Sequence, residues 1–172
     1  MKILTGKLRG IALEAPSGKE KTRPTSAKVR EALMSILSQD IEGSVFIDLF
    51  AGSGAVGIEA LSRGAAQCVF VEKDRQALGA LKKNLQTIAH HLKKQSLPLP
   101  QTTVYPLDLE KSADSLKSRI GTLGDIVWAD PPYQDTRQWL QNKQQIIGQL
   151  IVFQGLFIVE CEKNQLTGDE MN

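Results

Sequence analysis

Apolar, β-prone segments alternate with segments of helical periodicity from residue 45 almost to the end, and this alternation constrains the fold more than any other feature. The expected strands are Val45–Phe50, Cys68–Glu72, Thr102–Tyr105, Asp125–Ala129 and Gly155–Cys161. The first expected helix follows the glycine turn after Phe50 and ends at about Arg63. The others cover Arg75–His91, Leu109 to about Ile120 and roughly Thr136–Ile151. Repeated β-α units of this length favour a mainly parallel sheet with right-handed crossovers and helices on both faces. We therefore expect an α/β, doubly wound, Rossmann-like fold with the strand order 3-2-1-4-5.

A different region precedes this alternation. Residues 1–15 alternate apolar and polar side chains around two glycines, which predicts a short hairpin, and a polar loop follows to Pro24. A helix comes next, capped by Thr25 or Ser26, and its expected apolar stripe is Val29, Leu33, Ile36 and Leu37. Because 172 residues are too few for two comfortable domains, we expect a single domain with residues 1–42 as an extension and residues 43–172 as its core.

The composition excludes few classes of protein, and it is typical of a globular protein. Hydrophobic residues make up 41% of the chain and charged residues 23%. The chain has no apolar run of membrane-spanning length and no signal-like N-terminus, so we expect a cytoplasmic protein without membrane contact. Cys68 and Cys161 are expected to be buried thiols, and no Cys/His spacing suggests a metal site.

Basic residues crowd the first thirty positions although the net charge is only +2. Only Glu14 and Glu20 oppose this group, which consists of Lys2, Lys7, Arg9, Lys19, Lys21, Arg23, Lys28 and Arg30. A basic segment on a nearly neutral body is typical of phosphate contact. A solvated, lysine-rich arm without a ligand has the same charge pattern, so charge alone leaves both interpretations open.

A glycine-rich turn joins the first expected strand to its helix. Gly52, Gly54 and Gly57 satisfy the G-x-G-x-x-G pattern, and Glu72 ends the next strand where an acid would hold ribose hydroxyls. A nicotinamide dinucleotide and S-adenosylmethionine both fit this pattern. Asp48 favours S-adenosylmethionine. A carboxylate before the turn would repel the pyrophosphate of a dinucleotide, but it suits the ammonium and the sulfonium of S-adenosylmethionine. Asp108 could accept a hydrogen bond from an adenine amine or cap the following helix.

The fourth expected strand ends in Asp130-Pro131-Pro132-Tyr133. Neither proline can donate to a sheet, so the strand stops in a stiff turn. The Asp130 side chain and the Pro131 carbonyl can each accept one hydrogen of an NH₂ group, and the Tyr133 ring can stack on a flat substrate. A strand that simply ends in a proline turn is the alternative. Strands one and four are neighbours in the expected order, which would place this turn beside the glycine turn.

These blocks together resemble the bacterial family of S-adenosylmethionine-dependent methyltransferases that modify a guanine N2 of 16S ribosomal RNA, the small-subunit methyltransferase D type. The resemblance is carried by Thr22–Thr25 with Val29–Leu33, by Asp48–Ala65, and by Asp130–Tyr133. It implies a class I methyltransferase fold with S-adenosylmethionine as cofactor. It also implies 16S ribosomal RNA, within the small subunit or an assembly intermediate, as the partner.

The resemblance assigns roles to individual positions. The implied cofactor site consists of Asp48, Phe50, Ala51, Gly52, Ser53, Gly54, Glu72, Lys73, Asp108 and Leu109. The implied catalytic residues are Asp130, Pro131, Pro132 and Tyr133. Arg23 and Thr25 would lie near the catalytic mouth, and Lys7, Arg9, Lys28 and Arg30 would contact RNA.

The sequence also departs from the family pattern. Ala27 and Lys28 stand where an acid and an arginine are usual, and Met34-Ser35 replaces Phe-Asn. The family adds a final strand pair after the position of Glu162, where only Lys163–Asn172 remain, so we expect that pair to be missing and the fifth strand to lie at an edge. We expect a monomer, with a dimer through this edge as the alternative. Other acceptors (adenine N6 or a protein glutamine), a non-catalytic RNA-binding assembly factor and, last, a nicotinamide-dependent oxidoreductase also remain open.

Overall fold

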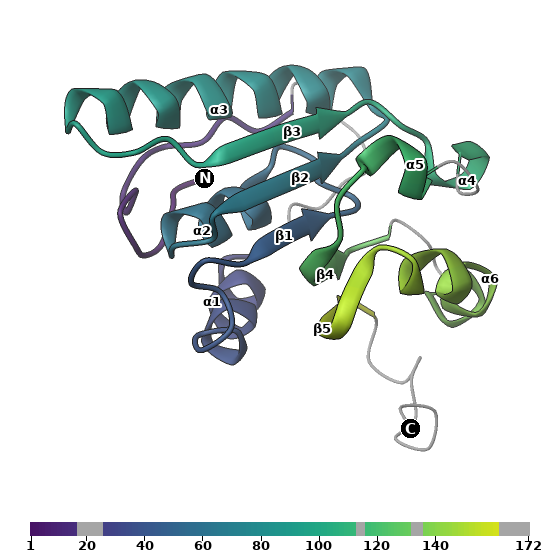
Figure 1. Cartoon of the computed structure of the whole chain (residues 1–172). Helices are drawn as coiled ribbons and strands as arrows, with labels where there is room; N and C mark the ends of the chain where they lie inside the picture. Colours follow the sequence, from purple (N-terminus) through teal and green to yellow (C-terminus); the bar gives the residue numbers. More distant parts are fainter. Residues whose placement is uncertain (17–25, 113–115, 132–135, 162–172) are drawn as a thin grey trace.

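The computed structural model describes residues 1–16, 26–112, 116–131 and 136–161. Its helices are α1 (Ala27–Ile36), α2 (Ala55–Ser62), α3 (Arg75–Lys94), α4 (Leu109–Ser112), α5 (Leu116–Ile120) and α6 (Thr136–Gly148). Its strands are β1 (Val45–Asp48), β2 (Gln67–Val71), β3 (Gln101–Tyr105), β4 (Gly124–Ala129) and β5 (Ile151–Val159). Strand and helix alternate from β1 onward, as the sequence predicts (Figure 1).

The five strands form one sheet in the order β3-β2-β1-β4-β5, and every neighbouring pair is parallel. Asp48 of β1 pairs with Phe70 of β2 on one side and with Trp128 of β4 on the other. The doubly wound, Rossmann-like α/β fold and its predicted strand order are therefore confirmed. The strand order reverses between β1 and β4, which is where open sheets of this kind bind ligands.

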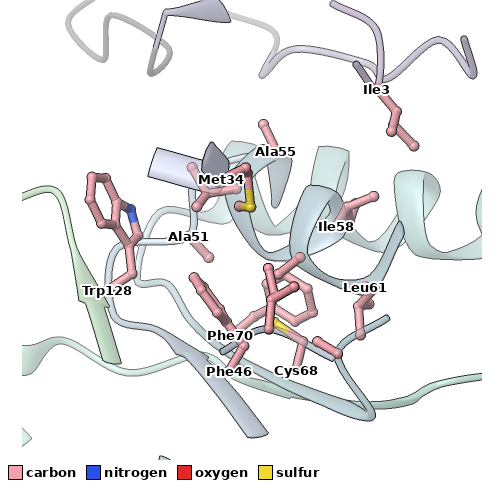
Figure 2. Close-up of a cluster of buried hydrophobic side chains, with 14 of the residues drawn as sticks. Ile3, Met34, Phe46, Ala51, Ala55, Ile58, Leu61, Cys68, Phe70 and Trp128 are labelled. Atoms are coloured by element: carbon pink, nitrogen blue, oxygen red, sulfur yellow. The ribbon is translucent and has the colours of Figure 1, made fainter. Parts of the chain in front are cut away.

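The central strands bury both of their faces, and the sheet separates two hydrophobic cores. Phe46 of β1 belongs to the core beneath α1, α2 and α3, whereas its neighbour Ile47 belongs to the core beneath α4, α5 and α6. The same alternation occurs along β4, where Trp128 faces the first core and Val127 the second. Figure 2 shows the first core, with Met34 of α1 lying near the start of α2. Burial on both faces explains why these strands read as continuous apolar runs.

The N-terminal segment folds back on itself and is attached to α2. Lys2 and Ala12 form one antiparallel bridge, so the predicted hairpin is present as a chain reversal with little regular strand. The buried carboxylate of Glu59 in α2 accepts hydrogen bonds from the backbone amides of Leu4 and Thr5, both at 2.9 Å. Because the first core contains side chains from this segment and from the sheet, residues 1–16 pack as part of the sheet's own interior.

Three expectations about the helices and strands are wrong: the buried face of α1, the single helix after β3, and the start of the last strand. Ile36 is 72% exposed, and the buried stripe of α1 uses Met34 instead, because Arg30, Leu33, Met34 and Leu37 follow the i, i+3, i+4, i+7 spacing of one helix face. Two short helices, α4 and α5, stand where one helix was expected.

The last strand begins at Ile151 rather than at Gly155, and α6 accordingly ends at Gly148. Gln154 has φ +66° within β5, and the β4–β5 register shifts between Gly124 and Ile126. The Gln154-Gly155 pair therefore marks a bulge inside the strand, although in the sequence it resembled the strand's start.

Candidate active site

Acidic side chains gather where the parallel strands end. Asp48 ends β1, Glu72 follows β2, Asp130 follows β4 and Glu160 follows β5, while Asp108 comes three residues after β3. Carboxyl ends of parallel strands meet at one edge of the sheet, on the right of Figure 1 for β1, β2 and β3. The fold therefore brings together residues that are more than 100 positions apart in the sequence.

The glycine turn between β1 and α2 needs glycine at two positions. Gly52 and Gly54 have φ of +54° and +82°, conformations that L side chains rarely adopt. A Cβ on Gly54 would also lie 2.4 Å from a methyl carbon of Leu81, whereas one on Gly52 would meet nothing within 4 Å. Gly54 thus allows the turn to pack on α3, and Gly52 leaves open space on the side where a ligand would approach.

Asp48 is 1% exposed and lies directly behind the turn. Its Oδ2 accepts a hydrogen bond from the Gly57 backbone amide at 3.2 Å, while its Oδ1 is buried with no hydrogen-bond partner among the described residues. The pKa of Asp48 is raised to about 7, mainly by burial; the nearby charges of Asp130 and Glu72 also raise it, while the backbone amides of Gly57 and Phe50 act against the rise. An unpartnered buried carboxylate oxygen is a suitable acceptor for the ammonium of a bound ligand.

Glu72 is held in a fixed orientation by backbone amides. Its Oε2 accepts from Gly52 at 2.7 Å, and its Oε1 accepts from Lys73 and Asp74 at 2.8 Å each. A carboxylate has about four acceptor sites, so one site remains for a hydroxyl group such as that of a ribose. The glycine turn and the acid at the end of β2 are thereby joined into one rigid unit.

The remaining residues of the predicted cofactor site surround this unit. The Lys73 ammonium lies 3.5 Å from Asp108 Oδ1, so the end of β2 and the segment after β3 are linked by an ion pair. Phe50 packs edge-on against Trp139 of α6, with ring centroids 5.3 Å apart. Ala51 donates its amide to Val71, and both Ser53 and Leu109 are buried.

Asp130 and Pro131 lie next to this cofactor region. Asp130 is half-buried and close enough for its charge to raise the pKa of Asp48 on the neighbouring strand, and Pro131 is buried. The structure thus brings the glycine turn and the Asp-Pro turn together, as the strand order predicts. Pro132 and Tyr133 lie outside the described residues.

The predicted RNA-contacting residues are dispersed. Lys7, Arg9 and Lys28 are exposed, but the Lys7 amide donates to the Ser62 carbonyl at the C-terminal end of α2, opposite to the glycine turn. Figure 1 places the N-terminus near the start of β3, at that same end of the sheet. Arg23 and Thr25 lie outside the described residues.

The prediction that Arg30 contacts RNA is wrong. Its side chain is 3% exposed, its Nη2 donates to the Lys2 carbonyl at 3.3 Å, and burial lowers the pKa of the guanidinium although Glu59 acts against this shift. Arg30 occupies the buried stripe of α1 and attaches that helix to the N-terminal segment.

Two residues of interest escaped the sequence reasoning. Asn84 of α3 is 1% exposed and connects the glycine turn to the N-terminal segment, donating to the carbonyls of Ser53 and Glu14 at 2.9 and 3.0 Å. Glu160 follows β5 beside Asp130. Signals for both exist: Asn84 falls at an apolar position of the α3 stripe, and Glu160 repeats the pattern of an acid at a strand end.

Comparison with known proteins identifies the family. The model of the family described as conserved hypothetical protein 95 matches residues 1–172. The chain belongs to this family. Ribosomal RNA small subunit methyltransferase D of Escherichia coli is 37% identical over 134 residues, which is 78% of this chain and 61% of that protein. The protein of that name from Buchnera aphidicola subsp. Acyrthosiphon pisum is 30% identical over 170 residues, which is 95% of this chain and 78% of that protein.

Solved structures support the same membership. A hypothetical protein of Thermus thermophilus superposes with a TM-score of 0.70 at 32% identity, covering 92% of this chain and 84% of that one. This chain therefore spans about three fifths of the Escherichia coli relative but most of the Thermus structure. S-adenosylmethionine is the cofactor that the family fold fits, and the unpartnered Asp48 oxygen and the open space before Gly52 agree with it.

Two further observations concern the described part of the chain. None of its helices is long and apolar enough to cross a membrane. Within the same residues, no group of three or more His, Cys, Asp or Glu side chains is arranged to hold a metal ion.

Proposed function

We propose that this protein transfers a methyl group from S-adenosylmethionine to the exocyclic N2 amine of a guanine in 16S ribosomal RNA, within the small ribosomal subunit or an assembly intermediate. The observation that carries the proposal is the convergence at the ends of β1 and β4. Asp48, with its unpartnered buried oxygen, lies there beside the glycine turn and close to Asp130. A cofactor site and an acceptor site for an amine would thus be adjacent, and relatives named ribosomal RNA small subunit methyltransferase D support RNA as the acceptor.

Each part of the cofactor has a candidate partner. Asp48 would hold the ammonium, Glu72 the ribose hydroxyls, and Asp108 with the Leu109 backbone the adenine. Gly52 and Gly54 would let the cofactor approach the backbone, and Lys73 would keep Asp108 oriented through their ion pair. The bound cofactor supplies an electrophilic methyl group on a sulfonium, which is already an excellent leaving group.

The chain's own task is therefore to position the acceptor. A guanine amine is a poor nucleophile because its lone pair is delocalised into the ring. The Asp130 carboxylate and the Pro131 carbonyl would each accept one amine hydrogen, which favours a pyramidal nitrogen whose lone pair points at the methyl carbon. Orientation of this kind can supply on the order of 7–11 kcal/mol. Tyr133 would stack on the unstacked base, and Asp130 would stabilise the positive charge that grows on nitrogen.

The N-terminal region would hold the RNA. We propose that residues 1–42 and 43–172 act as one domain, in which Lys7, Arg9, Arg23, Thr25 and Lys28 contact the RNA and the sheet carries the chemistry. A ribosomal substrate would place the protein in the cytoplasm. An adenine N6 or a protein glutamine as the acceptor keeps the same chemistry, and a non-catalytic assembly factor would keep only the RNA contact.

A labelling experiment distinguishes these alternatives. Purified protein and tritiated S-adenosylmethionine are incubated with small ribosomal subunits that lack their own guanine-N2 modification, and the RNA is digested to nucleosides. We expect label in N2-methylguanosine. Label in another nucleoside would change the acceptor, and label in protein would exclude RNA as the substrate. Cofactor binding without any label would favour the assembly factor.

Asp130→Ala tests the acceptor site. We expect this variant to lose methylation by more than about 100-fold, because the amine loses its acceptor, and to bind S-adenosylmethionine with nearly unchanged affinity. Single-turnover methylation and equilibrium dialysis measure the two quantities. Full activity of the variant would contradict the proposed mechanism.

A further inference from the structure

Asp130 and Glu160 follow two strands that are paired with each other. Ala129 of β4 is in register with Val159 of β5, and the Glu160 amide donates to the Ala129 carbonyl at 2.9 Å. The next position on each strand carries a carboxyl group, and these two groups are hydrogen-bonding neighbours. Two carboxyl groups so close cannot both ionise freely, which is the arrangement in which a pair shares one proton.

The pair lies in a partly dry environment. Glu160 is half-buried, but its Oε2 is covered from solvent and has no hydrogen-bond partner among the described residues. Burial first, and then the charge and hydrogen bond of Asp130, raise the pKa of Glu160 to about 7. Asp48, at the same edge of the sheet, is the other described acid with a buried oxygen that has no hydrogen-bond partner among the described residues. Asp48 ends β1 and Glu160 follows β5, the two strands that flank β4, and unsatisfied buried oxygens on both sides of β4 indicate a site that is completed by a ligand with N–H groups.

We propose that Glu160 is a positioning residue that acts through Asp130: it shares with the Asp130 carboxylate the proton that the acceptor amine releases. This inference rests on the proposed methyl transfer. It assigns Glu160 a role that acts through Asp130, since Asp130 is the group that contacts the amine.

In the proposed methyl transfer, a bond forms between the amine nitrogen and the methyl carbon while the sulfur–methyl bond breaks, and sulfur keeps the electron pair of the broken bond. The nitrogen then carries a positive charge and two hydrogens, and one proton passes to the Asp130 carboxylate. The hydrogen bond to Glu160 delocalises this proton over both carboxyl groups, and water later takes it from the exposed part of the pair.

The charged groups around the pair determine the expected pH dependence. Among the described acids at these strand ends, Asp48 interacts with the pair, because the charge of Asp130 raises the pKa of Asp48. Burial first, and then the like charge of Asp130, oppose ionisation of Glu160, so the pair accepts a proton at a higher pH than an isolated carboxylate. The methyl-transfer rate should therefore decrease as the pH falls through about 7, because a pair that already holds a proton accepts the next one less readily.

Glu160→Gln tests this role through a pH profile. The amide keeps the shape but removes the neighbouring charge, so Asp130 stays ionised to lower pH. We expect the acid limb of the single-turnover rate to move down by roughly 1 pH unit or more. Glu42→Gln, an exposed residue just before β1, controls for the change in net charge and should leave the profile unchanged. An active Glu160→Gln enzyme with the wild-type profile would overturn the proposal.

A titration without substrate separates this inference from the methylation itself. The Glu160 side-chain carboxyl is followed by ¹³C NMR in the wild-type protein and in Asp130→Asn. We expect titration near pH 7 in the wild type and at lower pH in the variant, because the charge of Asp130 is gone while burial, the larger cause, remains. Ordinary glutamate titration in both proteins would refute the pairing even in an active methyltransferase. The expected shift in a protein that labels no RNA would leave the pair intact and reject only the substrate.

Discussion

Asp48 is a residue that the fold buries without satisfying both of its oxygens. Its carboxylate is removed from water behind the glycine turn, and the Gly57 amide donates to one oxygen while the other has no hydrogen-bond partner among the described residues. A pKa raised from 3.8 to about 7 means that the folded protein binds a proton more tightly than the unfolded chain. Stability therefore decreases as the pH rises from about 4 through 7, since the ionised form is the costly one. The ionised Asp48 carboxylate thus destabilises the folded protein, and a cationic ligand beside it would offset that cost.

Asp48→Asn should separate these two effects. At pH 8 we expect the variant to unfold with a higher free energy than the wild type, by at most about 4 kcal/mol for a shift of about 3 pKa units, and the gain should shrink at pH 5. Affinity for S-adenosylmethionine should drop by at least about tenfold at pH 8, because the ammonium loses its anion. Urea unfolding and calorimetric titration measure the two quantities.

Asp125→Asn is the matched control for Asp48→Asn. Asp125 lies near the other end of β4, where its Oδ2 accepts from the Val45 amide, and an amide oxygen can still accept that hydrogen bond. We expect it to leave cofactor affinity nearly unchanged. Equal behaviour of the two variants would mean that Asp48 has no special relation to the cofactor.

At the scale of elements, α3 connects the cofactor turn to the N-terminal segment. Asn84 accepts from the Glu14 amide at 2.8 Å and donates to Glu14 and Ser53, so one buried side chain bridges two loops. The adjacent Lys83 also reaches Glu14, by an exposed ion pair of 3.1 Å. Neighbouring side chains thus contact the same residue, one from the interior and one from solvent.

These two contacts should differ greatly in strength. Asn84→Ala leaves buried backbone groups unpaired and should lower the free energy of unfolding by about 1–3 kcal/mol. Lys83→Ala removes an exposed ion pair and should cost less than about 0.5 kcal/mol. Chemical denaturation of both variants provides the comparison. A large loss from Lys83→Ala together with no loss from Asn84→Ala would show that the solvent-exposed contact, rather than the buried one, holds the segment.

The elements also show what can be predicted from sequence. Five apolar runs with intervening helices predicted the sheet, its order and the meeting of Asp48 with Asp130, because parallel topology leaves few alternatives. The bulge at Gln154 was read as a strand boundary, since an interruption within a strand and the start of one share the same residues. Arg30 was assigned to RNA because charge is visible in sequence, whereas its burial depends on the phase of α1.

At the scale of the whole molecule, two of the predicted RNA contacts, Lys7 and Arg9, lie at the end of the sheet opposite to the predicted chemistry. Lys7 is bonded near the C-terminal end of α2, while the glycine turn precedes that helix. The eight residues of α2 separate the two ends by about 12 Å. RNA held at both ends of α2 would have to lie along that helix. The basic residues of the Gly6–Gly10 turn would then bind the RNA at a distance from the target base.

Lys7→Ala combined with Arg9→Ala should therefore weaken RNA binding without slowing the chemistry. We expect the slope of log affinity against log salt to decrease by about 1 per lost contact, and the single-turnover rate at saturating RNA to stay unchanged. Lys82→Ala, an exposed change on α3, is the control for general charge loss. A slower rate at saturation would place these residues in the reaction itself.

The attachment of the N-terminal segment also has a consequence for the order of events during synthesis. Leu4 and Thr5 bond to Glu59, which is 55 and 54 residues further along, and Glu14 bonds to Asn84, 70 residues further. A ribosome makes about 5–20 residues per second, so these first residues leave it seconds before their partners exist. The lysines and arginines of this segment are thus made before the elements on which the segment packs. The segment emerges before its partners and can dock only after they have been made.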